Sequence, residues 1–267
     1  IFRQKCARVL LTNGGNNMEK QIIDRNSMKY WFPKVKDLGI PVPKTILLDV
    51  PVKDEEILEA AQEFQFPIFI RTYHAAAKHE WKETCYVKKR KRLIQQVKQM
   101  SMVNWHLPDD GIALREFLPL NYQFKAFNEM PVAKERRYFI KDGGIQCHHP
   151  YWPEESIQFY SIEKPERWRE QLAVLNTETD DEKVQLERMA KKVAQVVDGY
   201  WSVDFAQRNN GVWYLIDMAK GEDSFHWLDC PHCPEEQQEK YGHSGKKEQD
   251  MLSELIKKRE VEDERKQ

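Results

Sequence analysis

The stretch FPIFIRTYHAAAKHEWKETCYV, residues 66–87, decides how the fold of this chain is interpreted. It begins with an apolar segment that is typical of a buried strand, and a cation, Arg71, follows directly. An alanine-rich loop then carries Lys78 and His79 before a second strand is expected near Thr84. Because an unpaired cation is costly to bury, a strand that only fills a core does not need this arrangement. The pattern favours a site for a polyanion, and a solvated hairpin with surface charge is the alternative.

The residues around this stretch predict a small α+β lobe. Apolar positions at helical spacing predict three helices, at 27–39, 54–64 and 88–100. The segment IPVPKTILLDV, residues 40–50, predicts an extended approach to a strand. Strands and helices in this order are expected to pack in layers around one core.

Beyond Ile112 the pattern changes to strands. Alternating segments at 112–117, 131–140 and 145–152 predict a meander with a turn at 142–144. Helices are expected at about 165–175 and 181–197, and a hairpin joins the strands YWSVDFAQ and VWYLIDMA through the loop 208–211. The predicted organisation is an N-terminal segment and helix, a small lobe, a large lobe and a charged tail, over residues 1–40, 41–111, 112–235 and 236–267.

Composition limits the classes of partner. The 267 residues include 42 basic and 43 acidic side chains, a formal charge of -1, so any anion site must be local. No apolar run is long enough to span a bilayer, and we expect a soluble, cytoplasmic protein without a membrane partner. Five widely spaced cysteines in a chain this long are expected to be reduced thiols.

The terminal hairpin offers two carboxylates. Asp204 and Asp217 each follow an apolar strand segment, so paired strands can place them side by side. Buried like charges need a cation between them, and Mg²⁺ prefers oxygen ligands. The pair therefore predicts a magnesium site, while the alternative is that one aspartate bonds a turn.

Two further segments can contribute to a site. In REFLPL, Glu116 ends a strand where the lobes are expected to meet, and an extended hinge at Glu116, Phe117 and Leu118 offers backbone groups to a flat heterocycle. In KERRYFI, Glu135 and Arg137 share one strand face. Arg137 is suited to a phosphate or a substrate carboxylate, and a cross-strand surface ion pair is an equal alternative.

In this order, the motifs resemble the ATP-grasp superfamily over about residues 27–224. The resemblance rests on KYWFPKVKDLGIPVPKT, FPIFIRT, AAAKHEW, REFLPL, ERRYFIKDGGI and VDFAQRNNGVWYLIDMA. It implies two lobes that enclose ATP and Mg²⁺, with adenine at residues 116–118. The residues that it implies for the phosphates are Arg71, Lys78 and His79, those for the metal are Asp204 and Asp217, and those for catalysis are Arg137 and Lys78.

Two functions remain open on this resemblance. The first is a ligase that joins a carboxylate to an amine or similar nucleophile through an acylphosphate, on unknown substrates that include peptides or proteins. The second is an ATP-binding assembly factor for a protein partner, with little or no catalysis. Divergent branches of the family include a eukaryotic cell-division-cycle assembly factor and small bacterial and phage proteins.

One departure from the family favours the second function. Ala219 stands where the family often has an asparagine ligand, which leaves Glu222 or Asp223 as the nearest replacement. The charged segment 246–267 is a candidate docking helix.

Two other patterns are weaker. His226, Cys230 and Cys233, with His232 nearby, have zinc-ligand chemistry, but a single C-x-x-C pair is more typical of loop thiols. The basic run 88–92 begins an amphipathic helix and favours a solvated face over a nucleic-acid site.

Overall fold

The structure of the protein is a computed structural model that describes residues 24–161 and 163–242. Contacts divide the chain into two compact units, Ile1–Asp223 and Ser224–Gln267. Helices and antiparallel sheets confirm the expected α+β class. The lobe boundaries at residues 40, 111 and 235 stay predictions. Among the described residues, no helix is long and apolar enough to cross a membrane.

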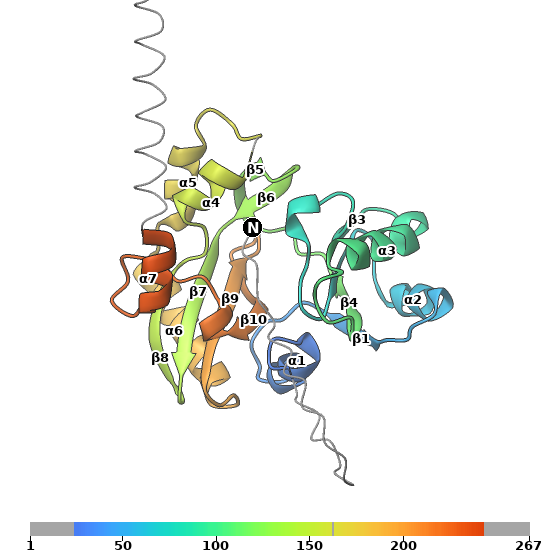
Figure 1. Ribbon diagram of the computed structural model, residues 1–267, viewed down its shortest axis with the longest axis horizontal. Coiled ribbons are helices and arrows are strands. Elements are labelled where there is room, and N and C mark those ends of the chain that lie inside the picture. Colours follow the sequence, from blue (N-terminus) through green and yellow to red (C-terminus); the bar gives the residue numbers. More distant parts are fainter. Residues whose placement is uncertain (1–23, 162, 243–267) are drawn as a thin grey trace, which may run out of the picture. The chain divides into compact units, whose positions relative to one another are not determined.

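The first sheet forms the core of the expected small lobe. It has four antiparallel strands in the order β1-β4-β2-β3. Their bounds are Thr45–Asp49 (β1), Ile68–Thr72 (β2), Tyr86–Val87 (β3) and Gly111–Glu116 (β4). Helices α2 (Asp54–Ala60) and α3 (Leu93–Val103) cover one face, as Figure 1 shows, and their apolar side chains pack on Ile68, Ile70 and Leu114. Since side chains alternate along a strand, Phe69, Arg71 and Arg115 point to the other face.

The second sheet carries the terminal hairpin. Its order is β10-β9-β7-β8, and all pairs are antiparallel. The bounds are Glu135–Lys141 (β7), Gly144–Pro150 (β8), Tyr200–Gln207 (β9) and Trp213–Lys220 (β10). Helix α6 (Asp180–Ala194) packs on the apolar face through Leu186, Ala190 and Val193.

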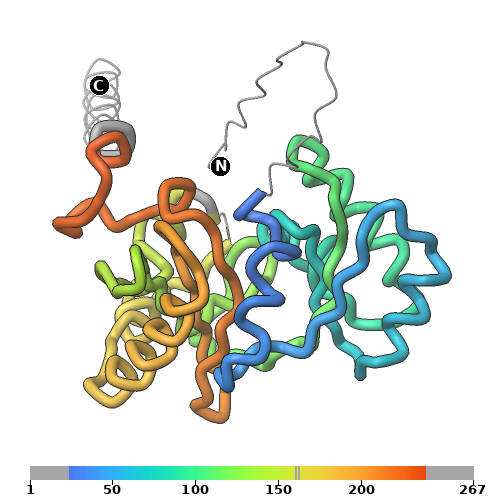
Figure 2. Tube along the Cα trace, turned by 90° about the horizontal axis from the view of Figure 1, so that it is seen from below, coloured from blue at the N-terminus to red at the C-terminus, as the bar shows by residue number. Residues whose placement is uncertain are grey.

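Helix α1 (Met28–Val35) joins the two sheets, and Figure 2 shows it between them in blue. Its buried face, with Met28 and Trp31, belongs to the same core as Trp201 and Leu215 of the second sheet. The backbone N–H of Met28 donates to the carbonyl of Tyr73 just beyond β2, and the N–H of Leu215 in β10 donates to Pro41. The predicted helix at 27–39 is therefore present but shorter, and it fixes one sheet against the other.

One predicted strand is wrong. The segment 131–140 is not a single strand, because β6 (Met130–Ala133) ends before Lys134 and β7 begins at Glu135. Strand β6 pairs with β5 (Tyr122–Ala126), which the sequence analysis did not include, and β7 pairs with β9. The reversal between β5 and β6 is made by Phe127, Asn128 and Glu129, all with positive φ. Since the turn contains no glycine, the usual sequence sign of a hairpin is missing there.

Two helices pack beside the β5–β6 hairpin. Helix α5 (Trp168–Asn176) confirms a predicted helix, whereas α4 (Glu154–Tyr160) was not predicted. Trp168, Leu172 and Leu175 form a core with Phe124 and Val132 of the hairpin.

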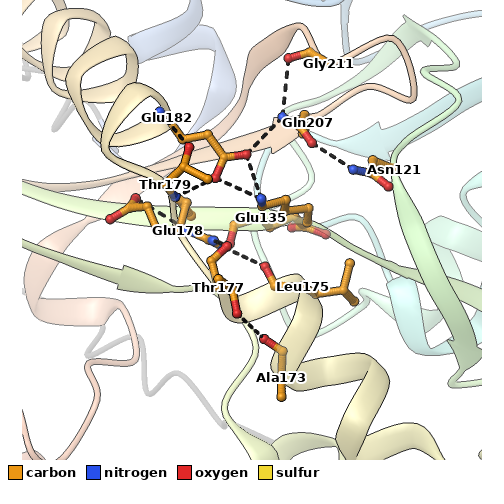
Figure 3. Close-up of polar contacts among 12 residues, drawn as sticks. Asn121, Glu135, Ala173, Leu175, Thr177, Glu178, Thr179, Glu182, Gln207 and Gly211 are labelled. Atoms are coloured by element: carbon orange, nitrogen blue, oxygen red, sulfur yellow. Dashed lines mark hydrogen bonds and ion pairs between the residues drawn. The ribbon is translucent and has the colours of Figure 1, made fainter.

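A buried polar cluster lies where β6 gives way to β7. We call Asn121, Lys134, Thr179, Glu182 and Gln207 the junction cluster. The ammonium of Lys134 donates to both carboxylate oxygens of Glu182, at 2.6 and 2.8 Å. Figure 3 shows Glu182 also accepting from Gln207, whose own amide oxygen accepts from Asn121. The cluster thus ties α6 to the ends of three strands.

The remaining segments bear on two weaker predictions. The basic run 88–92 is exposed, but Arg90 donates to the carbonyls of Leu58 and Ala61, which fits a helix-packing role. The second unit contains α7 (Glu235–Gly242), with His226 and Cys233 buried within the unit's described part. Zinc binding there stays a prediction, and the proposed docking segment 246–267 lies outside the described residues.

Candidate active site

Strand register places the predicted metal carboxylates together. Asp217 on β10 lies directly opposite Asp204 on β9, and Arg137 on β7 lies opposite Asp204 on its other side. Directly opposed residues share a sheet face, so these three side chains point away from the core that α6 covers. Glu135, two residues before Arg137, points the same way.

A bulge in β10 brings Ile216 into the site. Leu215 pairs with Phe205 and Asp217 pairs with Asp204, so Ile216 is an extra residue in the ladder. A bulged residue leaves backbone groups free of the ladder. The carbonyl of Ile216 accepts a hydrogen bond from Arg115 of the first sheet, at 2.7 Å.

Arg137 and Asp204 form a two-pronged ion pair. Nε and Nη2 of Arg137 each donate to one oxygen of Asp204, both at 2.7 Å. Burial by itself would lower the pKa of Arg137, but Asp204 outweighs it and raises the pKa above its ordinary value. Both side chains are nearly buried, at 13% and 6% exposed, so the pair is a fixed part of the sheet face.

The first sheet contributes cations to the same site. Nη1 of Arg71 lies 2.7 Å from Oδ1 of Asp217, although the arginine is 4% exposed and the aspartate 29%. Burial would raise the pKa of Asp217, but Arg71 and then Lys78 hold it below its ordinary value. Asp217 is therefore ionised at neutral pH, as a metal ligand must be.

The loop after β2 places Lys78 among acidic groups. Ala77 has φ 48°, in the left-handed region, and its carbonyl accepts from the hydroxyl of Thr84, which fixes the turn. Burial would lower the pKa of Lys78, but Tyr151 and then Glu135, Asp217 and Asp204 raise it above its ordinary value. The ammonium lies 5.2 Å from the Tyr151 ring centre, and the Arg137 guanidinium lies 4.7 Å from the same centre. Two cations thus flank one aromatic ring.

His79 lies elsewhere. Its ring packs edge-on against Phe127, with 4.9 Å between centres, and it is not among the residues that line the pocket. Burial lowers its pKa, which favours the neutral imidazole. A neutral ring turned towards a core aromatic gives no geometric support to the predicted phosphate contact, which stays a prediction.

A pocket connects the cations to the expected hinge. Its cavity volume is about 90 Å³, and ligand pockets are usually about 300–1,000 Å³, so a nucleotide needs the site to open. The polar lining consists of Arg71, Lys78, Arg115, Glu116, Glu135 and Asp217. The apolar lining includes Phe69, Trp81, Phe117, Leu118, Trp152 and Ile216. The hinge at Glu116–Leu118 therefore borders a surface that suits a flat heterocycle.

Sequence reasoning missed two buried charges in this lining. Arg115 is 4% exposed, and its Nη2 has no hydrogen-bond partner among the described residues. Glu135 is also 4% exposed; Oε1 accepts from the Trp152 indole at 3.3 Å, while Oε2 has no such partner. The position of Arg115 two residues beyond Ala113, which pairs with Arg71, was a usable sign, because residues two apart share a strand face.

The residues present fit a magnesium ion. The aspartates are side by side, and oxygen donors of this kind are what Mg²⁺ prefers. Ala219 faces Ser202 and offers no ligand side chain. Asp223, a suggested replacement, instead accepts from the Asn26 amide at 2.7 Å, so it is engaged at the edge of β10.

Comparison with known families gives one match over most of the chain. The model of an ATP-grasp domain, the third family of its clade, matches residues 58–232. That range includes the β-strands that carry Arg71, Arg137 and the two aspartates. No curated protein sequence matches the chain.

Solved structures with a similar fold are distant. An N5-carboxyaminoimidazole synthase from Aspergillus clavatus, in complex with ADP and 5-aminoimidazole ribonucleotide, has 11% identity and a TM-score of 0.49, over 76% of this chain and 45% of that one. A D-alanine–D-alanine ligase from Bacillus anthracis complexed with ATP has 15% identity and a TM-score of 0.45, over 74% and 55%. The VanG D-Ala:D-Ser ligase from Enterococcus faecalis has 11% identity and a TM-score of 0.48, over 73% and 52%. The chain spans about half the length of these proteins.

Proposed function

Because the chain belongs to this third clade family of ATP-grasp domains, we propose that it is an ATP- and Mg²⁺-dependent ligase that joins a carboxylate to an amine or similar nucleophile. One observation carries the proposal beyond the family. Arg71 of the first sheet and Asp217 of the second meet at 2.7 Å across the pocket that the hinge borders. Phosphate-binding and metal-binding chemistry are thus brought together at one end of a heterocycle site.

The pocket suggests how a nucleotide lies. The base fits between the apolar side chains of Phe69 and Ile216, beside the hinge, and the phosphates extend towards Arg71 and Lys78. The unpartnered oxygen of Glu135 is suited to accept from a ribose hydroxyl.

The ion pairs suggest that magnesium enters with the nucleotide. The cations around the pocket, Arg71, Lys78, Arg115 and Arg137, outnumber the carboxylates, Glu135, Asp204 and Asp217. A free divalent cation would meet an excess of positive charge, whereas Mg·ATP carries net negative charge. Arg71 then exchanges Asp217 for phosphate oxygens, and Asp217 becomes free for the metal.

The chemistry follows from positioning and charge. When bound, magnesium held by Asp204 and Asp217 would neutralise phosphate oxygens. A substrate carboxylate oxygen attacks the γ-phosphorus, the bond from that phosphorus to the bridging oxygen breaks, and ADP leaves. An amine nitrogen then attacks the acyl carbon, inorganic phosphate leaves, and the nitrogen loses a proton. Arg137 and Lys78, fixed on either side of Tyr151, stabilise the negative charge of the transferred group.

The test separates binding from turnover. Isothermal titration should show ATP binding that Mg²⁺ strengthens, and a panel of acids and amines, including peptides, should contain a pair that drives ADP release. Tight Mg·ATP binding without turnover across the whole panel would favour the assembly-factor function. Absence of ATP binding would contradict both.

The control for this test is Asp54→Asn. Asp54 forms an exposed ion pair with Lys98 far from the pocket, so the variant should behave as the wild type. A loss in this variant would show that the assay measures general damage to the fold.

A further inference from the structure

Arg115 is a buried cation that the nucleotide site described above does not use. It lies on β4 directly opposite Phe69 of β2 and Thr45 of β1, so its side chain faces the pocket. It immediately precedes the hinge residue Glu116. Its place is therefore between the base surface and the strand position that carries Arg71.

The contacts of Arg115 fix it in one orientation. Nε donates to the Thr45 hydroxyl at 3.1 Å, and Nη1 donates to the Ile216 carbonyl at 2.7 Å. Nη2 is buried and has no hydrogen-bond partner among the described residues. A held guanidinium with one donor left over is pre-organised for an acceptor that comes from outside the chain.

The charge of Arg115 is also uncompensated. Arg71 and Arg137 each have an aspartate partner, but none of the described carboxylates forms an ion pair with Arg115. Burial, and then the neighbouring Arg71, lower its pKa, while Asp217 partly opposes them. Because a buried charge without a counter-charge is costly, the missing partner is an anion.

We propose that Arg115 binds the α-phosphate of the nucleotide. This rests on the proposed function. Residues two apart on a strand are about 6–7 Å apart, which is the scale of one step along a phosphate chain from Arg71 towards the base. The terminal phosphates then lie at Arg71 and Lys78, and the phosphate nearest the nucleoside lies at Nη2 of Arg115.

The experiment is a ladder of ligands measured by isothermal titration. ATP, ADP, AMP and adenosine are titrated into the wild type, Arg115→Met and Arg71→Met. Arg115→Met should weaken ATP, ADP and AMP by a similar factor of about 10–100, the range for a hydrogen bond to a charged group, and leave adenosine unchanged. Arg71→Met should weaken ATP and ADP but leave AMP nearly unchanged.

Matched variants separate binding from positioning. Thr45→Val removes only the Nε partner, so it should weaken AMP less than Arg115→Met does. Arg115→Lys keeps the charge without the fork and should lie between the wild type and methionine variants, even if Arg115→Met does not fold. Circular dichroism and thermal unfolding check the fold of each protein.

Three outcomes would overturn the inference. Equal losses for AMP and adenosine would mean that Arg115 supports the hinge or the base. A wild type that loses as much affinity for 7-deaza-ATP as Arg115→Met loses for ATP would place Nη2 on the purine ring. Unchanged AMP affinity in Arg115→Met would leave Arg115 without a phosphate. In each of these the wild type still binds ATP, so the proposed function survives; a wild type that binds no adenine nucleotide would remove both.

Discussion

Two buried charged clusters lie on either side of Glu135 and differ in one respect. In the junction cluster around Lys134 and Glu182, each side chain has a partner within the chain. In the pocket, Nη2 of Arg115 and Oε2 of Glu135 are buried without one among the described residues. Since buried polar groups are normally satisfied, the first cluster is complete as it stands and the second is completed by a ligand. The comparison separates charges that hold the fold from charges that bind.

The largest expected effect is on the closed cluster. Lys134→Met leaves Glu182, 14% exposed, without its cation, and removing one partner of a buried pair costs about 3 kcal/mol or slightly more. Urea unfolding should show this loss, while ATP affinity under native conditions stays within about twofold. Lys98→Met, in an exposed ion pair, is the control and should cost less than about 1 kcal/mol. A large drop in ATP affinity with little loss of stability would contradict the division between the clusters.

The second prediction concerns the open cluster. Asp217→Asn removes a charged metal ligand at a side chain that is 29% exposed, so binding should suffer more than stability. The gain in ATP affinity that Mg²⁺ gives to the wild type should fall at least about tenfold, as measured by titration with and without the metal. Asp223→Asn, at the edge of the same strand, should keep the gain. An unchanged Mg²⁺ effect in Asp217→Asn would remove the metal assignment.

The third prediction returns to the closed cluster at smaller scale. Thr179 caps α6, since its hydroxyl accepts from the N–H of Glu182 while the Glu182 carboxylate accepts from the N–H of Thr179. Thr179→Ala should cost about 1 kcal/mol of unfolding free energy and leave nucleotide affinity unchanged. Thr177→Ala, whose hydroxyl donates only to the Ala173 carbonyl, is the matched control and should cost less.

The smallest expected effect is the pH dependence of the Arg71–Asp217 pair. The folded pKa of Asp217 lies below its ordinary value of 3.8, so the pair stabilises the fold at pH above that value and is lost as pH falls through the folded pKa. The stability difference between the wild type and Asp217→Asn should stay constant from neutral pH to about pH 5 and shrink below about pH 4. A difference that grows on acidification would mean that the carboxylate is not held ionised by the arginine.

Much of the fold was predictable because its strands are apolar segments with clear turns between them. The loop that ends at Gly211 separates β9 from β10, so the sequence alone places Asp204 and Asp217 on neighbouring strands. The β5–β6 hairpin was not predictable, because its turn uses Phe127, Asn128 and Glu129 in place of glycine. The break at Lys134 was hidden too, since the residues on both sides continue the same pattern while their partners differ.

The candidate site divides in the same way. The aspartate pair follows from the hairpin register, but the role of Arg115 depends on a carbonyl and a hydroxyl from distant strands. Such contacts leave no local pattern in the sequence. The neutral environment of His79 likewise comes from Phe127, which is far away along the chain.

The bulge at Ile216 gives strand length a chemical meaning. A chain without this residue would still place Asp217 opposite Asp204, because the register resumes on either side of it. Such a chain would keep both aspartates but lose the carbonyl that anchors Arg115 and one wall of the base surface. A single inserted or deleted codon at this point can therefore retune the affinity of the pocket while every charged side chain around it remains unaltered.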